Sequence, residues 1–204
     1  MSKSGSDDAV IKDLIITKEG VSWSGSGVSI YNSSVTVIGC RITDNTEAGI
    51  RISGSLVMKP QIINCTITNN TAKYPGGGGI LCYKNANITG CMISGNFAIG
   101  GGSATEDGGG IWLVGSSPTI NDCMILDNFV DGEGGGIYCR GDSNPSINNC
   151  TISGNSAEEN GGGISCLEDS SPTITSCTIT NNIAQDFGGG LFILDNSNPE
   201  IEDT

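Results

Sequence analysis

A motif of the form I-x-x-C-x-I-x-x-N recurs six times in the chain, with Val37 in place of the first isoleucine in the first copy. It predicts an all-β fold, a right-handed single-stranded parallel β-helix (a solenoid) of about seven coils of about 27 residues each. Two further observations support this prediction. A second motif, glycine followed by apolar-x-apolar, interleaves with the first. The cysteines of the first motif are 25, 26, 32, 27 and 27 residues apart, which is the period of a solenoid.

The elements of one coil follow in order from Pro145. Proline is tolerated just before a strand, so the first strand is expected around Ile147. The step from Ile147 to Cys150 is three positions, which is an odd number. The chain must therefore bend between the two residues if both side chains face inward. The second strand then carries Cys150 and the next isoleucine. The motif's asparagine, Asn155, is expected to close a corner through its tolerance of left-handed backbone and an amide ladder.

The third strand of the same coil contains residues 164–166, directly after three glycines at 161–163. We expect these glycines to return the chain through φ angles that other residues avoid. They are not followed by Lys and Ser or Thr at the start of a helix, so they do not form a phosphate-binding loop. In this arrangement, the isoleucines and cysteines of all strands face the interior.

The nine cysteines follow the coil period. Six occupy one interior ladder, and the other three, Cys82, Cys139 and Cys166, occupy a second. We interpret them as buried free thiols that pack as small apolar groups, with one or two disulfides as the alternative. The chain has no C-x-x-C pair and no histidine, so a zinc site is not predicted.

Composition limits the partners. The formal net charge of −13 argues against binding nucleic acid or anionic membranes. No apolar run is long enough for membrane insertion, and the N-terminal residues lack the apolar region of a signal peptide. We expect residues 1–10 to be a polar N-terminal segment or leader, and residues 11–204 to form one β-helix domain.

The stretches ISGNSAEENGGGISC and GGGIYCRGDSNPSINNCTISGN resemble the right-handed parallel β-helix repeat proteins of bacterial surfaces and are similar to polymorphic outer membrane protein repeats. That family's G-G-A-I and F-x-x-N hallmarks stand here as GGGI, beginning at Gly108, Gly134 and Gly161, and as I-x-x-N. The resemblance covers about residues 28–201. It implies a secreted or surface-displayed protein, often adhesive or structural, and it transfers no catalytic residue. The same fold also hosts polysaccharide lyases and hydrolases.

The outward positions of the third strand are mostly apolar. Three interpretations remain open: the chain's own glycine-rich loops cover this face, another protein chain packs on it, or sugars stack on Trp112 and Tyr138. The candidate binding residues are Leu81, Tyr83, Trp112, Tyr138, Arg140 and Phe192.

Acidic residues stand just before the glycines in successive coils. Solvated loop acids are one interpretation, and Ca²⁺ ligands are the other, because carboxylates beside turn carbonyls suit a hard cation. The candidate metal ligands are Asp107, Glu133, Glu159 and Asp186.

Catalysis is not predicted. The outward positions of the C-x-I strand offer no acid/base pair. The outward Thr-x-Thr pairs of this strand could suggest an ice-binding face, but Arg41, Met92, Met124 and Leu126 interrupt their array. Ile201 and Thr204 end the chain in the register of Ile11 and Leu14, which indicates either a fragment of a longer array or subunits that stack head to tail.

The sequence therefore predicts a non-catalytic, extracellular or cell-surface structural or adhesive β-helix with a protein partner, a second copy or a surface protein. It would assemble into fibres through its ends or its lateral apolar face. A polysaccharide-binding or polysaccharide-degrading module is the alternative, with carbohydrate as its partner.

Overall fold

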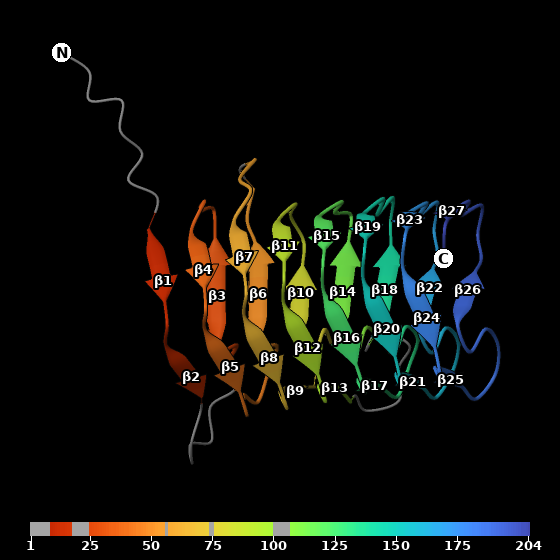
Figure 1. Ribbon diagram of the computed structural model, residues 1–204, viewed down its shortest axis with the longest axis horizontal. Coiled ribbons are helices and arrows are strands. Elements are labelled where there is room, and N and C mark those ends of the chain that lie inside the picture. The colour runs from red at the N-terminus through yellow and green to blue at the C-terminus, as the bar shows by residue number, and fades with distance from the viewer. Residues whose placement is uncertain (1–8, 18–24, 56, 74–75, 100–106) are drawn as a thin grey trace.

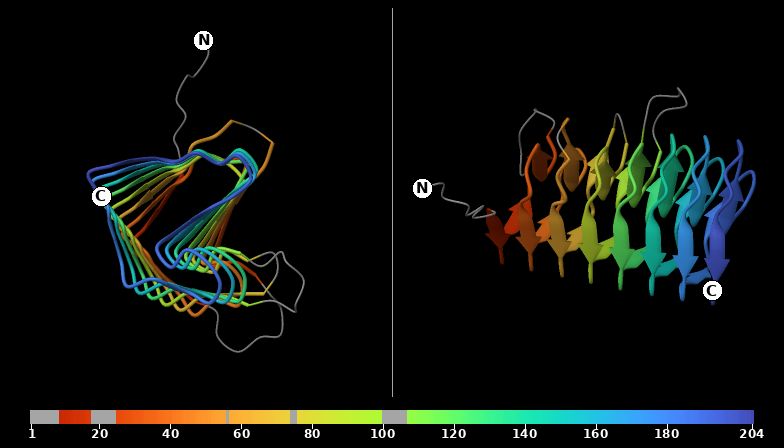
Figure 2. Two further views of the ribbon diagram at one scale, coloured as in Figure 1. Left: turned by 90° about the vertical axis from the view of Figure 1, so that its right-hand side faces the viewer. Right: turned by 90° about the horizontal axis from the view of Figure 1, so that it is seen from above.

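The chain forms a stack of coils along one axis, with its first and last strands at opposite ends of the stack (Figure 1). The structure is a computed structural model that describes residues 9–17, 25–55, 57–73, 76–99 and 107–204. Four parallel sheets run along the stack, and all strand pairing is between successive coils. Seen down the axis, the coils superimpose closely (Figure 2). The all-β parallel solenoid predicted from the repeats is therefore confirmed.

Sheets A and B contain the strands before and after the bend that precedes each motif cysteine. Sheet A consists of β1 (Val10–Lys12), β4 (Thr36–Ile38), β7 (Gln61–Ile63), β11 (Asn87–Thr89), β15 (Thr119–Asn121), β19 (Ser146–Asn148), β23 (Thr173–Thr175) and β27 (Glu200–Glu202). Sheet B consists of β2 (Ile15–Thr17), β5 (Arg41–Thr43), β8 (Thr66–Thr68), β12 (Met92–Ser94), β16 (Met124–Leu126), β20 (Thr151–Ser153) and β24 (Thr178–Thr180). The last four strands of sheet A, β15, β19, β23 and β27, each begin directly after a proline, as expected.

Sheet C contains the strands that follow the glycines. Its members are β3 (Val28–Tyr31), β6 (Ile50–Ser53), β10 (Ile80–Cys82), β14 (Ile111–Val114), β18 (Ile137–Arg140), β22 (Ile164–Cys166) and β26 (Leu191–Ile193). Sheet D, which the sequence analysis missed, consists of the two-residue strands β9 (Thr71–Ala72), β13 (Phe97–Ala98), β17 (Phe129–Val130), β21 (Ser156–Ala157) and β25 (Ile183–Ala184). Each of these five strands directly follows the asparagine corner of its coil.

The strands pair in the register of the sequence motif. Ile120 lies beside Ile147, and Ile125 lies beside Ile152 in the next sheet. In sheet C, Cys139 pairs with Cys166. Because each slot stacks on the same slot of the next coil, the side chains form continuous interior columns, and the isoleucines of the interior coils, such as Ile147 and Ile152, are fully buried. This burial of branched aliphatic groups is the main favourable contribution to the fold.

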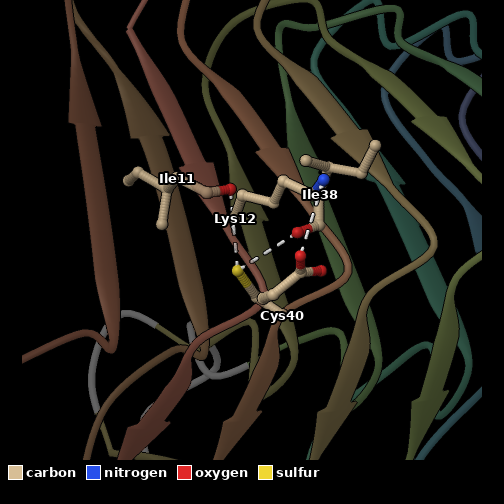
Figure 3. Close-up of polar contacts among 5 residues, drawn as sticks. Ile11, Lys12, Ile38 and Cys40 are labelled. Atoms are coloured by element: carbon tan, nitrogen blue, oxygen red, sulfur yellow. Dashed lines mark hydrogen bonds and ion pairs between the residues drawn. The ribbon is translucent and has the colours of Figure 1, made fainter.

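All nine cysteines are free and buried, which agrees with the free-thiol interpretation. The six thiols of the first ladder each donate to backbone carbonyls. Cys40 Sγ lies 3.6 Å from the carbonyl oxygen of Ile11 and 3.5 Å from that of Ile38, beside the ion pair of Lys12 and Asp13 (Figure 3). Each thiol therefore satisfies carbonyls at the bend between sheets A and B while filling a small interior space.

The motif asparagines form a second ladder. Asn128 Nδ2 donates to Asn155 Oδ1 at 2.9 Å and to the carbonyl oxygen of Ile93 at 3.0 Å. Its own Oδ1 accepts from the backbone N–H and the amide of Asn96. One detail of the prediction was wrong: the left-handed backbone belongs to the preceding residue, such as Asp127 with φ 52°. The asparagine itself serves as the hydrogen-bonding group inside the corner.

The three glycines have two different functions. Only the first of them, such as Gly108 with φ +68°, has a left-handed backbone. The second and third are needed because successive coils approach closely: a Cβ on Gly109 would lie 2.5 Å from the carbonyl oxygen of Phe129 and 2.7 Å from that of Gly135. Backbone atoms on both sides leave no room for a side chain.

Candidate interaction surfaces

The outer face of sheet C is covered in its first row. Leu81, Trp112, Tyr138 and Ser165 occupy one outward slot on successive strands, and their exposed fractions are between 0 and 6%. The rings of Trp112 and Tyr138 have centroids 6.3 Å apart and an interplanar angle of 49°. Together with Ala48 and Leu81 they form a small cluster outside the main core. This burial agrees with the interpretation that the chain itself covers the row, and contacts with another protein or with sugars stay predictions.

The first glycine of each group of three lies against the base of this outward side chain. A Cβ on Gly108 would lie 2.7 Å from the Cβ of Trp112, and one on Gly134 would lie 2.7 Å from that of Tyr138. The loop is therefore in close contact with the start of its own strand. This contact, together with the positive φ, requires glycine at that position.

The second outward row of sheet C is partly exposed. The Arg140 guanidinium contacts the Glu168 carboxylate at 2.6 Å, and this hydrogen bond raises the pKa of Arg140 and lowers that of Glu168. Tyr83 lies under the guanidinium of Arg51, which is 5.5 Å from the ring centroid. Phe192 pairs with Ser165 and therefore continues the first row on the last strand of the sheet, where it is half-buried. The six candidate binding residues therefore lie on one face, with different accessibility, and their role in binding stays a prediction.

The four candidate metal ligands belong to two slots rather than one. Asp107 and Glu133 precede the first glycine of their coils, and in the next coils that slot holds Asn160 and then Phe187. Glu159 and Asp186 lie one residue earlier, in the slot of Gly132: the N–H of Glu159 donates to the carbonyl of Gly132, and that of Asp186 donates to the carbonyl of Glu159.

The acids of the first slot are joined from coil to coil by hydrogen bonds. Asp107 Oδ1 accepts the backbone N–H of Glu133 at 3.1 Å. Glu133 in turn accepts from Asn160 Nδ2 at 2.7 Å and from Ser165 Oγ at 3.3 Å. Asn160 Oδ1 accepts the N–H of Phe187 at 3.2 Å. These side chains therefore connect successive loops above sheet C.

Burial controls the ionisation of this group. Asp107 is 4% exposed, and burial raises its pKa from 3.8 to about 7, opposed in part by the hydrogen bond from Glu133. Burial also raises the pKa of Glu133, and it raises that of Tyr138 beyond the range of physiological titration. Glu159 and Asp186 are exposed.

Within the described residues, no group of three or more His, Cys, Asp or Glu side chains is arranged to hold a metal ion. Calcium binding by the four acids stays a prediction, which melting temperatures measured with Ca²⁺ and with a chelator would test.

Among the described residues, the buried side-chain nitrogen or oxygen that lacks a hydrogen-bond partner is Trp112 Nε1.

Sequence reasoning missed the exposed apolar side chains of sheet D. Phe97 is 42% exposed on β13, and its ring centroid lies 6.1 Å from that of Phe129 on β17. Met92 and Met124, outward on sheet B, are 37% and 47% exposed. The recurring asparagine-x-small residue pattern, as in Asn96 to Ala98, was the signal that could have revealed the strands that carry the two phenylalanines.

The fold and the repeats agree with the comparison to known families. The model of the right-handed beta helix region matches residues 2–157 and, in a second match, residues 128–204. The chain belongs to the right-handed beta helix family. This membership agrees with the predicted handedness. No curated protein and no solved structure matched the chain. In the part of this β-helix that the structure describes, no helix is long and apolar enough to cross a membrane.

Proposed function

We propose that this β-helix is a non-catalytic structural or adhesive rod, secreted or held at a cell surface, that acts by presenting side chains to a protein partner. One observation carries the proposal: the acids with shifted pKa are used to join successive loops. Asp107 accepts a hydrogen bond from the backbone of the next coil, and both carboxylate oxygens of Glu133 accept hydrogen bonds from side chains of the coil that follows its own.

This arrangement differs from what glycoside hydrolysis needs. A hydrolase places two carboxyl groups on either side of an accessible glycosidic bond, one of them free to protonate the leaving group. Here the two carboxyls follow one another along the stack, and Asp107 is buried while Glu133 is half-buried. A mechanical role for them is the simpler account, because carboxylates that accept hydrogen bonds stabilise the positions of the donors.

The experiment has two parts. The purified chain is incubated with a panel of acidic and neutral polysaccharides, and released reducing ends and unsaturated products are measured; we expect no turnover. Cells of the source organism are then treated with a protease that does not enter them, and loss of the chain from intact cells would support surface display. Turnover that Glu133→Gln abolishes, or a chain fully protected inside the cells, would contradict the proposal.

Polysaccharide binding is the second candidate, and the unpartnered indole N–H of Trp112 is the observation that favours it, since a sugar hydroxyl can accept from it. The burial of Trp112 and Tyr138 argues against it, because stacking requires an open ring face. A glycan array separates the two candidates. Specific binding that is lost in Trp112→Phe, which keeps an aromatic ring and removes the indole N–H, would favour polysaccharide binding.

A further inference from the structure

Five outward apolar side chains lie on two neighbouring interior coils at the corner between sheets B and D, and Leu126 and Phe129 among them are half-buried. Met92 and Phe97 lie on β12 and β13 of one coil, and Met124, Leu126 and Phe129 lie on β16 and β17 of the next. Their exposed fractions reach 47% at Met124 and 42% at Phe97. We call these five side chains the Met/Phe patch.

The repeat itself does not explain the Met/Phe patch. The slot of the two methionines holds Thr66 in the coil before and Thr151 in the coil after. The slot of the two phenylalanines is likewise flanked by Thr71 and Ser156. Threonine and serine therefore fit these outward positions, and the apolar residues are not needed for the packing of the core, which lies on the other side of each strand.

The chemistry of the patch suits an adaptable contact. Methionine side chains are flexible and polarizable, and they adjust to partners of different shape. The two phenyl rings are tilted by 46° to one another and offer π faces that attract cations. Exposed apolar groups that gather in this way usually mark a contact site.

The charges around the patch are mostly negative. Asp122 and Asp127 stand at the two turns that bracket β16, and both are exposed. Glu158 directly follows β21 of sheet D and is also exposed. Lys73, which follows β9 in the coil before the patch, is an exposed cation. The whole chain carries a formal charge of −13. A partner of positive charge is therefore attracted, and a second copy of this chain is repelled.

We propose that the Met/Phe patch binds a cationic amphipathic segment of a partner protein, in which lysine or arginine is interspersed with apolar residues. The inference rests on the proposed role of the rod as a contact surface. The apolar side chains of the segment pack on Met92, Met124 and the phenylalanines, and its cations reach Asp122 and Asp127 or lie over the phenyl faces.

The test uses the full chain and a short synthetic amphipathic peptide of leucine and lysine, with binding measured by calorimetry at two salt concentrations. The variant Phe97→Thr/Met124→Thr/Phe129→Ser takes its new residues from the same slots of flanking coils, so it is expected to fold, and a thermal melt checks this. We expect the affinity to fall by about ten-fold or more in this variant. Asp122→Asn/Asp127→Asn should weaken binding by about three-fold, and less at high salt.

Two control variants separate the patch from general effects. Tyr31→Ser removes an exposed aromatic ring on β3, and Asp195→Asn removes an acid at a turn after sheet C; neither should change the affinity. Equal affinity in the triple variant, or equal binding of a leucine and glutamate peptide, would overturn the proposal. Concentration-dependent sedimentation that the triple variant abolishes would show that a second copy is the occupant. Polysaccharide turnover with intact peptide binding would contradict the proposed function but not this site.

Discussion

Asp107 is a carboxyl group whose ionisation opposes folding. Its pKa in the fold is about 7, against 3.8 for a free group, so its neutral form is favoured by the fold. This contribution to stability is fully present below pH 3.8 and is lost as the pH rises through 7. Asp107→Asn keeps an oxygen that accepts the N–H of Glu133 and removes the charge. We expect the variant to be more stable at pH 8, by an amount on the order of 2–4 kcal/mol, and equal to the parent near pH 3.

Thermal melts of both proteins from pH 3 to pH 8 measure this difference. Asp122→Asn is the matched control, because it removes an equal charge from an exposed turn. If Asp107→Asn melts at or below the parent temperature at pH 8, the buried carboxyl is not a destabilising group.

Asn128 tests the asparagine ladder at the same scale. Asn128→Ala leaves the buried N–H and amide of Asn96 without their acceptor, and it leaves the carbonyl of Ile93 without its donor. Unsatisfied buried groups cost about 1–3 kcal/mol each, so we expect a loss of about 3 kcal/mol or more. Asn182→Ala, in the half-buried last rung, should cost less because water can replace the lost bonds. Urea denaturation of both variants gives the comparison, and equal losses would contradict it.

At the scale of the element, the glycines set how closely coils approach. Gly109→Ala places a Cβ against backbone oxygens of two neighbouring segments, which cannot move without separating the coils. Gly115, unlike Gly109, has a positive φ, and its Cβ would meet its nearest neighbour, the carbonyl oxygen of Gly141, at 3.6 Å. We expect Gly109→Ala to prevent folding or to lower the melting temperature far more than Gly115→Ala, whose cost is the backbone strain of about 1 kcal/mol. Similar melting temperatures would mean that the coils can move apart at little cost.

Sheets A, B and C were predictable because each of their strands shows apolar residues in fixed interior slots, such as Ile147, Cys150 and Ile164. Sheet D was not, because strands of two residues contain only one interior position and show no alternation. The register of the acids was missed for a related reason. Glu133 stands directly before the first glycine of its coil, whereas Glu159 stands one residue earlier, so counting the exact distance to the first glycine gives the observed slots.

The cover of sheet C shows what the sequence could not provide. Whether loops shield outward side chains depends on loop direction, and the repeat motif does not encode that direction. Trp112 therefore has the same pattern in the sequence as an exposed aromatic residue, although its exposed fraction is 6%. The exposure of Phe97 was not predicted, because the two-residue strand that carries it was not recognised in the sequence.

For the whole molecule, the interior thiols report on the integrity of the stack. Burial raises the pKa of Cys82 to about 12, and all nine thiols are free and buried. Because the thiolate is the reactive form, we expect no reaction with an aromatic disulfide reagent in buffer and nine equivalents in denaturant. Fewer than nine equivalents without a reductant would indicate disulfides, and rapid reaction in buffer would place thiols on the surface.

Stability along this 204-residue chain should depend on how many neighbours a coil has. The strands of interior coils, such as β12, β16 and β20, pair on both sides, whereas β1 and β27 pair on one side only. In a solenoid the stability is approximately a sum of coil terms and nearest-neighbour terms, so end coils open without the rest. The burial agrees with this, since Ile201 in β27 is 44% exposed while Ile147 in the same column is fully buried. Hydrogen exchange followed by mass spectrometry should show protection that rises from β1 to β12 and falls again from β20 to β27. Uniform protection would mean that the stack opens as one cooperative unit.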